Sequence, residues 1–287
     1  MDDRSGRARA QASRDGGVPT SSGEASLRAK LLPFVLGATA GSADVIGFLG
    51  LGGLFIAHIT GNLVILAARI GGGDRAPLAH LLSVPVFITV LALARLLAAA
   101  LERIRIAPLV PLLALQLALL SAFLAVCIIA GTQVDPNSAS MIIAGMLGVS
   151  AMAVQNTLVV FALNGAPSTA VMTTNITRLV MDLGEVLLGR GAGDRAKAGE
   201  RARHTGLAIA GFLLGCTLGA ACQATLGLRS VAVPAGLALL ALVLGIRGAQ
   251  ARASDLRSAA STSMSNDQPV VLTDGPQSRR ADAVSLE

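Results

Sequence analysis

Apolar residues dominate the chain between residues 31 and 248, where Gly, Pro and charged residues divide them into successive runs. The runs lie at about residues 32–50, 54–70, 78–100, 108–130, 139–163, 169–189, 204–226 and 230–247. A helix needs about 20 apolar residues to cross a bilayer. The third, fourth, fifth, seventh and eighth runs meet this length easily. The pattern therefore predicts an all-α integral membrane protein with six to eight transmembrane helices.

The composition agrees with this fold class. Of the 287 residues, 53% are apolar and 14% are charged, against about 25% charged in an ordinary soluble domain. The chain has no Trp, no Tyr and seven Phe, so few aromatic rings are available to stack on bases. We therefore expect no nucleic-acid partner despite the sequence pI of about 10.5, and a lipid bilayer as the environment.

Both ends of the chain are polar. We expect residues 1–30 to form a disordered basic tail and residues 249–287 a second disordered tail, around a membrane domain at 31–248. The cations before the first apolar run are Arg4, Arg7, Arg9, Arg14, Arg28 and Lys30. Positive charge favours the cytoplasmic side, so both termini are expected there, together with the basic loop 190–203.

The second and sixth runs carry polar residues and share a motif. Thr60-Gly61-Asn62 in the second run is matched 113 residues further on by Thr173-Thr174-Asn175 in the sixth. Gly71–Arg75 likewise resembles Gly191–Arg195. The segment Gly41–Asp44 in the first run also corresponds to a similar segment in the fifth run. Because the matches occur in the same order, they predict two pseudosymmetric repeats at 31–130 and 139–248.

Repeated halves are common in secondary transporters, where the binding site lies at matching interrupted helices near the membrane midplane. The second and sixth helices are therefore candidates for a break. If both cross the membrane, the protein has eight helices in parallel halves. If neither crosses fully, it has six helices in inverted halves. The loop charges do not decide between these topologies.

Polar residues within the runs provide the candidate site. A carboxylate within a span is costly and is a functional hypothesis by default. Asp44 is interpreted either as a proton or cation acceptor or as the partner of a buried Arg. The substrate-binding candidates are Asp44, His58, Thr60, Asn62, Gln155, Asn156, Thr173 and Asn175. The alternative role for these side chains is hydrogen bonding that holds helices together.

Charged and small residues of the second half suggest two further roles. Arg178 and Asp182 are four residues apart and share a helix face, so we interpret them as a structural ion pair or as gate or coupling groups. The glycines at 211, 215 and 219 predict a close-packed helix face, within the protein or in a homo-oligomer. The sequence shows no catalytic motif and no metal-ligand spacing, so no enzyme, metal or cofactor is predicted.

The motifs resemble those of a known family. Gly41–Phe48, Gly52–Asn62, Gln155-Asn156 and Thr173–Leu179 are similar to the signature of the YoaK family, over residues 31–248. The second copy has Thr174 where family members generally have Gly. The resemblance implies a multi-pass protein of the bacterial inner (plasma) membrane, and it implies no established activity.

These observations predict a multi-pass inner-membrane protein of uncharacterised activity, with two readings of its function. The first is a secondary transporter or exporter of a small solute, with the site between the two repeats and a polar cavity at mid-depth. The alternative is a non-transporting scaffold or regulatory protein, with every polar group paired inside the protein. An intramembrane enzyme would need a nucleophile beside a base, which the sequence does not offer.

Overall fold

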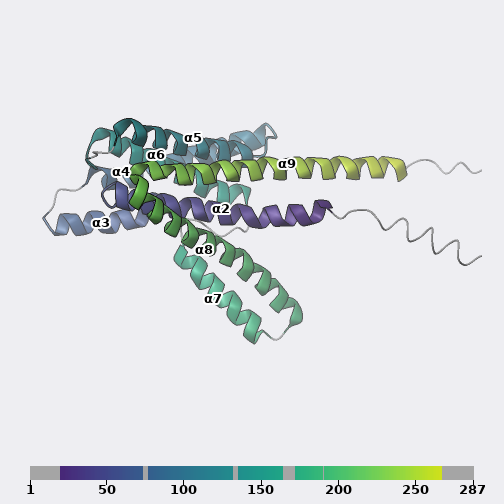
Figure 1. Cartoon of the computed structure of the whole chain (residues 1–287). Helices are drawn as coiled ribbons and strands as arrows, with labels where there is room; N and C mark the ends of the chain where they lie inside the picture. Colours follow the sequence, from purple (N-terminus) through teal and green to yellow (C-terminus); the bar gives the residue numbers. More distant parts are fainter. Residues whose placement is uncertain (1–19, 74–76, 132–134, 164–171, 190, 267–287) are drawn as a thin grey trace, which may run out of the picture. The chain divides into compact units, whose positions relative to one another are not determined.

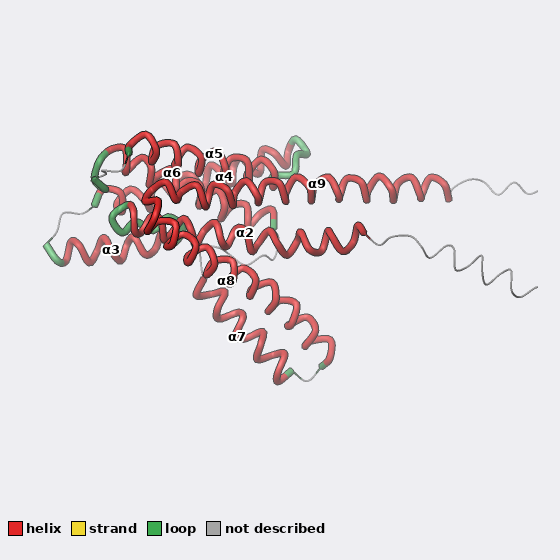
Figure 2. Tube along the Cα trace, in the orientation of Figure 1, coloured by secondary structure: helices red, strands yellow, loops and turns green. Residues whose placement is uncertain are grey.

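The structure, a computed structural model, describes residues 20–73, 77–131, 135–163, 172–189 and 191–266 (Figure 1). Over these residues it contains helices and no strand (Figure 2). The helices are α2 (Thr20–Gly50), α3 (Ile59–Gly71), α4 (Leu78–Arg103), α5 (Leu109–Ala130), α6 (Ala139–Ala162), α7 (Met172–Leu188), α8 (Ala192–Leu226), the short 3₁₀ helix η1 (Gly227–Val231) and α9 (Ala232–Asn266). Each predicted apolar run contains one α-helix, which confirms the all-helical class.

Five stretches are long and apolar enough to cross a membrane. They are Leu31–Gly50, Leu78–Arg103, Leu109–Ala130, Ala139–Ala162 and Ala192–Ala251, the last of which includes α8, η1 and the beginning of α9. The two doubtful runs form short helices: α3 has 13 residues and α7 has 17. At 1.5 Å per residue these measure about 20 and 26 Å, less than the hydrocarbon thickness of about 30 Å. Within the described residues, both helices are therefore shorter than this thickness.

The first and last described helices, α2 and α9, extend beyond the predicted membrane domain at residues 31–248. α2 begins at Thr20 and α9 ends at Asn266, so parts of the segments expected as disordered tails are helical. Extension of an existing helix avoids the cost of nucleation, and residues 249–266 include five Ala, the residue that most favours helix. Residues 1–19 and 267–287 lie outside the described part. The chain from Gln250 onward forms a second unit.

Glycines bring α2 and α8 into backbone contact. A Cβ on Gly41 would lie 2.2 Å from the carbonyl oxygen of Phe212, and one on Gly211 would lie 2.1 Å from that of Phe34. Residue numbers rise together across this contact, so the two helices run parallel. The predicted glycine face of α8 is therefore a packing face within the protein, like the small-residue contacts common in membrane helices.

The remaining helices pack in pairs around two apolar clusters. α6 contacts both α4 and α5, while α3 contacts α4 and α7 contacts α8. One cluster contains Ile46, Phe123 and Met141 and is joined by Leu54 and Ile56 from the connection between α2 and α3. The other contains Leu36, Ala98, Leu112, Leu158 and Ala241. The non-helical segment 51–58 therefore contributes to the core of the helix bundle.

Candidate functional site

The chain leaves α2 at Gly50 and folds back through residues 51–58 before α3 begins. Leu54 and Ile56 in this segment have no exposed surface. Gly52 and Gly53 adopt φ values of +69° and +89°, a left-handed conformation that residues with a side chain rarely adopt. The consecutive glycines therefore allow the sharp reversal that returns the chain to the protein interior.

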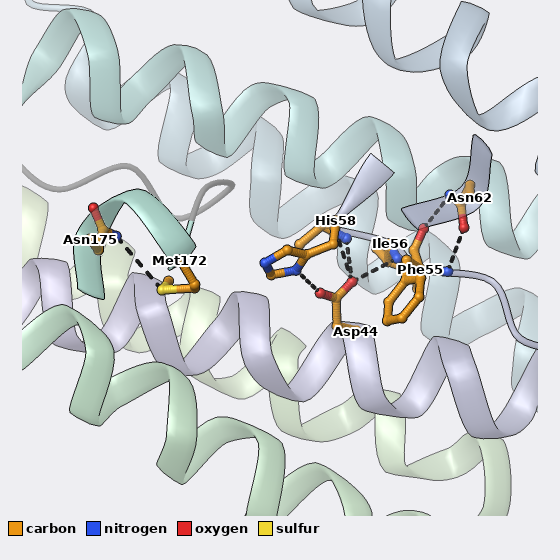
Figure 3. A network of polar contacts seen from close by, with 8 residues as sticks. Asp44, Phe55, Ile56, His58, Asn62, Met172 and Asn175 are labelled. Atoms are coloured by element: carbon orange, nitrogen blue, oxygen red, sulfur yellow. Dashed lines mark hydrogen bonds and ion pairs between the residues drawn. The ribbon is translucent and has the colours of Figure 1, made fainter. Parts of the chain in front are cut away.

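Asp44 of α2 holds this segment in place (Figure 3). Its side chain is buried, and its Oδ1 atom accepts hydrogen bonds from the backbone N–H groups of Ile56 at 2.8 Å, Ala57 at 2.5 Å and His58 at 3.3 Å. These residues immediately precede α3, where the helix dipole favours negative charge. The carboxylate therefore satisfies backbone donors that would otherwise be buried without partners.

His58 completes the contacts of this carboxylate. Its Nδ1 atom forms a hydrogen bond with Oδ2 of Asp44, and its ring packs edge-on against Phe212 of α8 at 5.3 Å between ring centroids. The side chain stays 28% exposed. His58 lies outside the long apolar helices, and its hydrogen bond to Asp44 raises its pKa, with the charge of Asp44 adding to the effect and burial opposing it.

Asn62 holds the same segment from the first turn of α3. Its Oδ1 accepts the N–H of Phe55 at 2.9 Å, and its Nδ2 donates to the carbonyl of Phe55 at 2.8 Å. A Cβ on the neighbouring Gly61 would lie 2.7 Å from the Phe55 ring. The Gly-Asn pair of the motif thus has a local explanation: Asn62 satisfies both polar backbone groups of Phe55, and Gly61 leaves room for its ring.

The polar pair of α6 lies in a different set of contacts. Gln155 is fully buried, accepts a hydrogen bond from Nε2 of Gln116 at 2.6 Å and donates to the carbonyl of Leu36 at 3.1 Å. It thereby joins α6 to α5 and to α2. Asn156 donates to the carbonyl of Met152 in its own helix at 3.0 Å.

The structure describes only part of the region around the second copy of the motif. Thr60 and Thr173 are exposed, away from the contacts of Asp44. Asn175 is buried and donates to the sulfur of Met172 at 3.7 Å. Residues 164–171, which precede α7 and include the counterpart of Phe55, lie outside the described residues.

Asp182 pairs across helices rather than along its own. It accepts a hydrogen bond from Nε of Arg201 in α8 at 2.9 Å, and Glu185 accepts one from Nη2 of the same side chain at 2.7 Å. Arg178 is exposed and forms no ion pair within the described residues. The predicted pair on one helix face is thus replaced by a pair with α8, because Asp182 lies on the side of α7 that contacts α8.

Sequence reasoning missed three residues that the structure makes notable. Gln116 was detectable as the one amide in the apolar run 108–130, while Arg201 was hidden among the cations of a charged segment. His80 of α4 is 1% exposed, and neither ring nitrogen has a hydrogen-bond partner among the described residues. Its position at the beginning of an apolar run gave no sign of this burial.

Comparison with known proteins gives a family and no activity. No curated protein and no solved structure matches the chain. Residues 32–244 match the family described as a protein of unknown function, DUF1275. This match covers more than half of the chain and includes every helix of the membrane domain apart from the outer parts of α2 and α9. The chain therefore belongs to the DUF1275 family, in agreement with the uncharacterised membrane family that its motifs resemble.

Proposed function

We propose that this protein is a secondary transporter of a small solute, with its site beside the break between α2 and α3. The observation that carries the proposal is the non-helical segment 51–58, whose backbone groups are held by Asp44 and Asn62 inside the helix bundle. Non-helical backbone at membrane depth is tolerated where it is buried in protein or lines a cavity. In transporters such breaks mark the binding site.

The helix contacts support two related halves. The proposed repeats pair α2 with α6, α3 with α7, α4 with α8 and α5 with α9. Under this correspondence, the contact of α2 with α8 is the counterpart of α6 with α4, and that of α3 with α4 is the counterpart of α7 with α8. We assign three spans to each half, because α3 and α7 are the shortest of the described α-helices. An odd number of spans gives the halves opposite orientations, as in inverted-repeat transporters.

The distribution of cations supports one orientation of the protein in the membrane. The N-terminal ends of the parallel helices α2 and α8 face the same side, and both are rich in cations. Arg103 at the end of α4 and Arg105 after it fall on this side in a six-span topology. Following the positive-inside rule, we propose that this side is cytoplasmic, that both termini lie there, and that the membrane is the bacterial inner membrane.

The contacts suggest different roles for the residues of the proposed site. Asp44 and Asn62 use their polar atoms on the segment 51–58, so we assign them to holding the break. His58 is partly exposed while bound to Asp44, so we assign it to contact with the solute or to proton exchange. An imidazole with a neighbouring carboxylate is suited to gaining and losing a proton in the physiological range.

One observation favours the alternative, a non-transporting scaffold. Asp44 accepts hydrogen bonds from other groups of the protein, and Asn62 and Gln155 donate them, as side chains do when they only join helices. The two functions differ in what a solute does. A transporter exchanges solute across a bilayer, whereas a scaffold does not.

Counterflow in proteoliposomes tests the proposal without knowledge of the coupling ion. Vesicles containing the full chain are loaded with an unlabelled amino acid, carboxylate, sugar or nucleoside, and entry of the labelled compound is followed. We expect the parent to accelerate entry of at least one class and the His58→Gln variant to lose this acceleration. Thr217→Ala should keep it, because the exposed Thr217 hydroxyl donates only to carbonyls of its own helix α8. Entry no faster than in empty vesicles for every class would favour the scaffold.

A further inference from the structure

Aromatic rings form a continuous set of contacts with His58. The ring centroids of His58 and Phe212 are 5.3 Å apart, and those of His58 and Phe55 are 6.5 Å apart. Phe48 extends this set, with its centroid 5.0 Å from that of Phe55. None of these four side chains is fully buried. Because aromatic faces attract cations, this surface suits a positive charge on His58 and also a positively charged ligand.

The carboxylate beside this surface has few charged neighbours along the chain. Within residues 31–50 of α2, Asp44 is the only charged residue. The helices α5 and α6, residues 205–226 of α8 and residues 163–177 contain none. A charge within a membrane domain is costly unless another charge or a polar group offsets it. These segments therefore provide no cationic side chain for Asp44.

The neighbouring helices contribute three titratable groups near the segment 51–58. Cys216 of α8, whose sulfur lies 3.1 Å from the Cβ position of Gly41, is a neutral thiol at pH 7. His80 of α4 lies at the other end of the segment, with Nε2 4.0 Å from the Cβ position of Gly53. Arg69 lies about 15 Å along α3 from its beginning. The base in hydrogen-bond contact with Asp44 is His58.

The charge at this surface depends on the proton of His58. The backbone N–H groups at the beginning of α3 offset part of the charge of Asp44, since a helix N-terminus carries about half a positive unit. Protonated His58 offsets the rest, and neutral His58 leaves a net negative charge. Nδ1 is bound to Asp44, so the exchangeable proton is the one on Nε2, which points away from Asp44 (Figure 3). Since like charges repel, this proton and a bound cation exclude each other.

We infer that the solute is an organic cation, which binds against the rings of Phe55, His58 and Phe212 in exchange for the proton on Nε2 of His58. The inference rests on the proposed transport function, because it names the substrate class of the same site. When the cation binds, the Nε2–H bond breaks, its electron pair stays on the nitrogen and the proton passes to solvent. The total charge at the site is unchanged. A neutral or anionic solute would leave the carboxylate unmatched.

Binding of radiolabelled benzyltrimethylammonium to the purified full chain in a neutral detergent tests this site. The probe has no ionisable proton, so a proton released on binding comes from the protein. Below the folded pKa of His58, we expect release of about one proton per bound cation and about tenfold weaker binding for each unit that the pH falls. Above that pKa, we expect no release and a constant Kd. Labelled benzenesulfonate, an anion of similar size, should not bind.

Four variants assign the exchange to His58 and the rings. His58→Gln should release no proton and should bind the cation more weakly, with a Kd that does not change with pH. His204→Gln, which removes a half-buried histidine eight residues before Phe212 on α8, should behave as the parent. Phe212→Leu should weaken binding about 2- to 30-fold. Phe161→Leu, which removes a ring that contacts Arg95 instead, should leave the affinity unchanged.

The outcomes separate this inference from the transport proposal. Absence of cation binding, equal binding of benzenesulfonate, or unchanged proton release in His58→Gln would overturn the inference. The counterflow assay is extended to benzyltrimethylammonium. Counterflow of a neutral or anionic solute by a chain that does not bind the cation would overturn the inference and leave transport standing. Cation binding with proton release, but without counterflow of the cation, would support the ligand class and contradict transport.

Discussion

Replacement of Asp44 by Ala tests the role of this carboxylate in the fold. The change leaves the N–H groups of Ile56 and Ala57 without their acceptor, and both residues are buried. A buried donor without a partner costs about 1–3 kcal/mol, so the loss of two acceptors should lower the free energy of unfolding by about 2–6 kcal/mol. His58 also loses its partner, which places the expected value in the upper part of this range.

The assay is unfolding of the detergent-solubilised chain by increasing SDS fraction, followed by circular dichroism. Ser42→Ala is the matched control, because Ser42 is buried in the same helix and donates only to the carbonyl of Thr39 one turn away. We expect the control to change stability by less than about 1 kcal/mol. Asp44→Asn retains an acceptor oxygen and should fall between the two.

A stability of Asp44→Ala equal to that of Ser42→Ala would contradict this role of the carboxylate. That result would mean that the backbone donors of the segment 51–58 find other partners at no cost. The carboxylate would then be free for a solute or a cation, and the assignment of Asp44 to holding the break would be wrong.

Asn62, His58 and the contact between α2 and α8 can be tested by substitution in the same way. Asn62→Leu removes both hydrogen bonds to Phe55 and should cost about 1–3 kcal/mol in the SDS titration, whereas a cost near zero would deny these bonds a structural role. The hydrogen bond to Asp44 raises the pKa of His58, so the stability that this pair contributes should be complete below the unfolded pKa of about 6.5 and should disappear as pH rises through the folded pKa. His58→Gln should flatten this pH dependence of Tm. An unchanged profile of Tm against pH in the variant would contradict the pairing. Gly211→Val should separate α2 from α8, because the new Cβ would lie 2.1 Å from the carbonyl oxygen of Phe34. This variant should lower Tm far more than Gly236→Val, since no atom lies within 4 Å of a Cβ on Gly236. Equal losses of Tm in the two variants would refute the close contact.

Hydrophobic patterning predicted the helices because their apolar runs are long and strongly bounded. It failed at the beginning of α3, which the pattern placed near residue 54 and the structure places at Ile59. Residues 54–58 are apolar enough for a helix, but their backbone donors bond to a carboxylate in a different helix. No local pattern reports a partner that lies a dozen residues away.

The candidate site was predicted as a set of residue types rather than as a set of contacts. Asp44, His58 and Asn62 lie in one region, at the segment 51–58, and their role in binding a solute stays a prediction. Helical spacing paired Arg178 with Asp182, but Arg201 on the neighbouring helix offers two hydrogen bonds to carboxylates of α7 and takes that place. Spacing within one helix cannot weigh such a competitor.

The segment 51–58 is an ordered, non-helical part of the protein interior held by Asp44. Hydrogen exchange of the peptide that covers Ile56 and Ala57, measured by mass spectrometry in detergent, tests it most directly. Buried, hydrogen-bonded amides exchange slowly, so we predict protection comparable to that of α6 in the parent and loss of protection in Asp44→Ala. Rapid exchange of this peptide in the parent, as for an exposed loop, would contradict the claim.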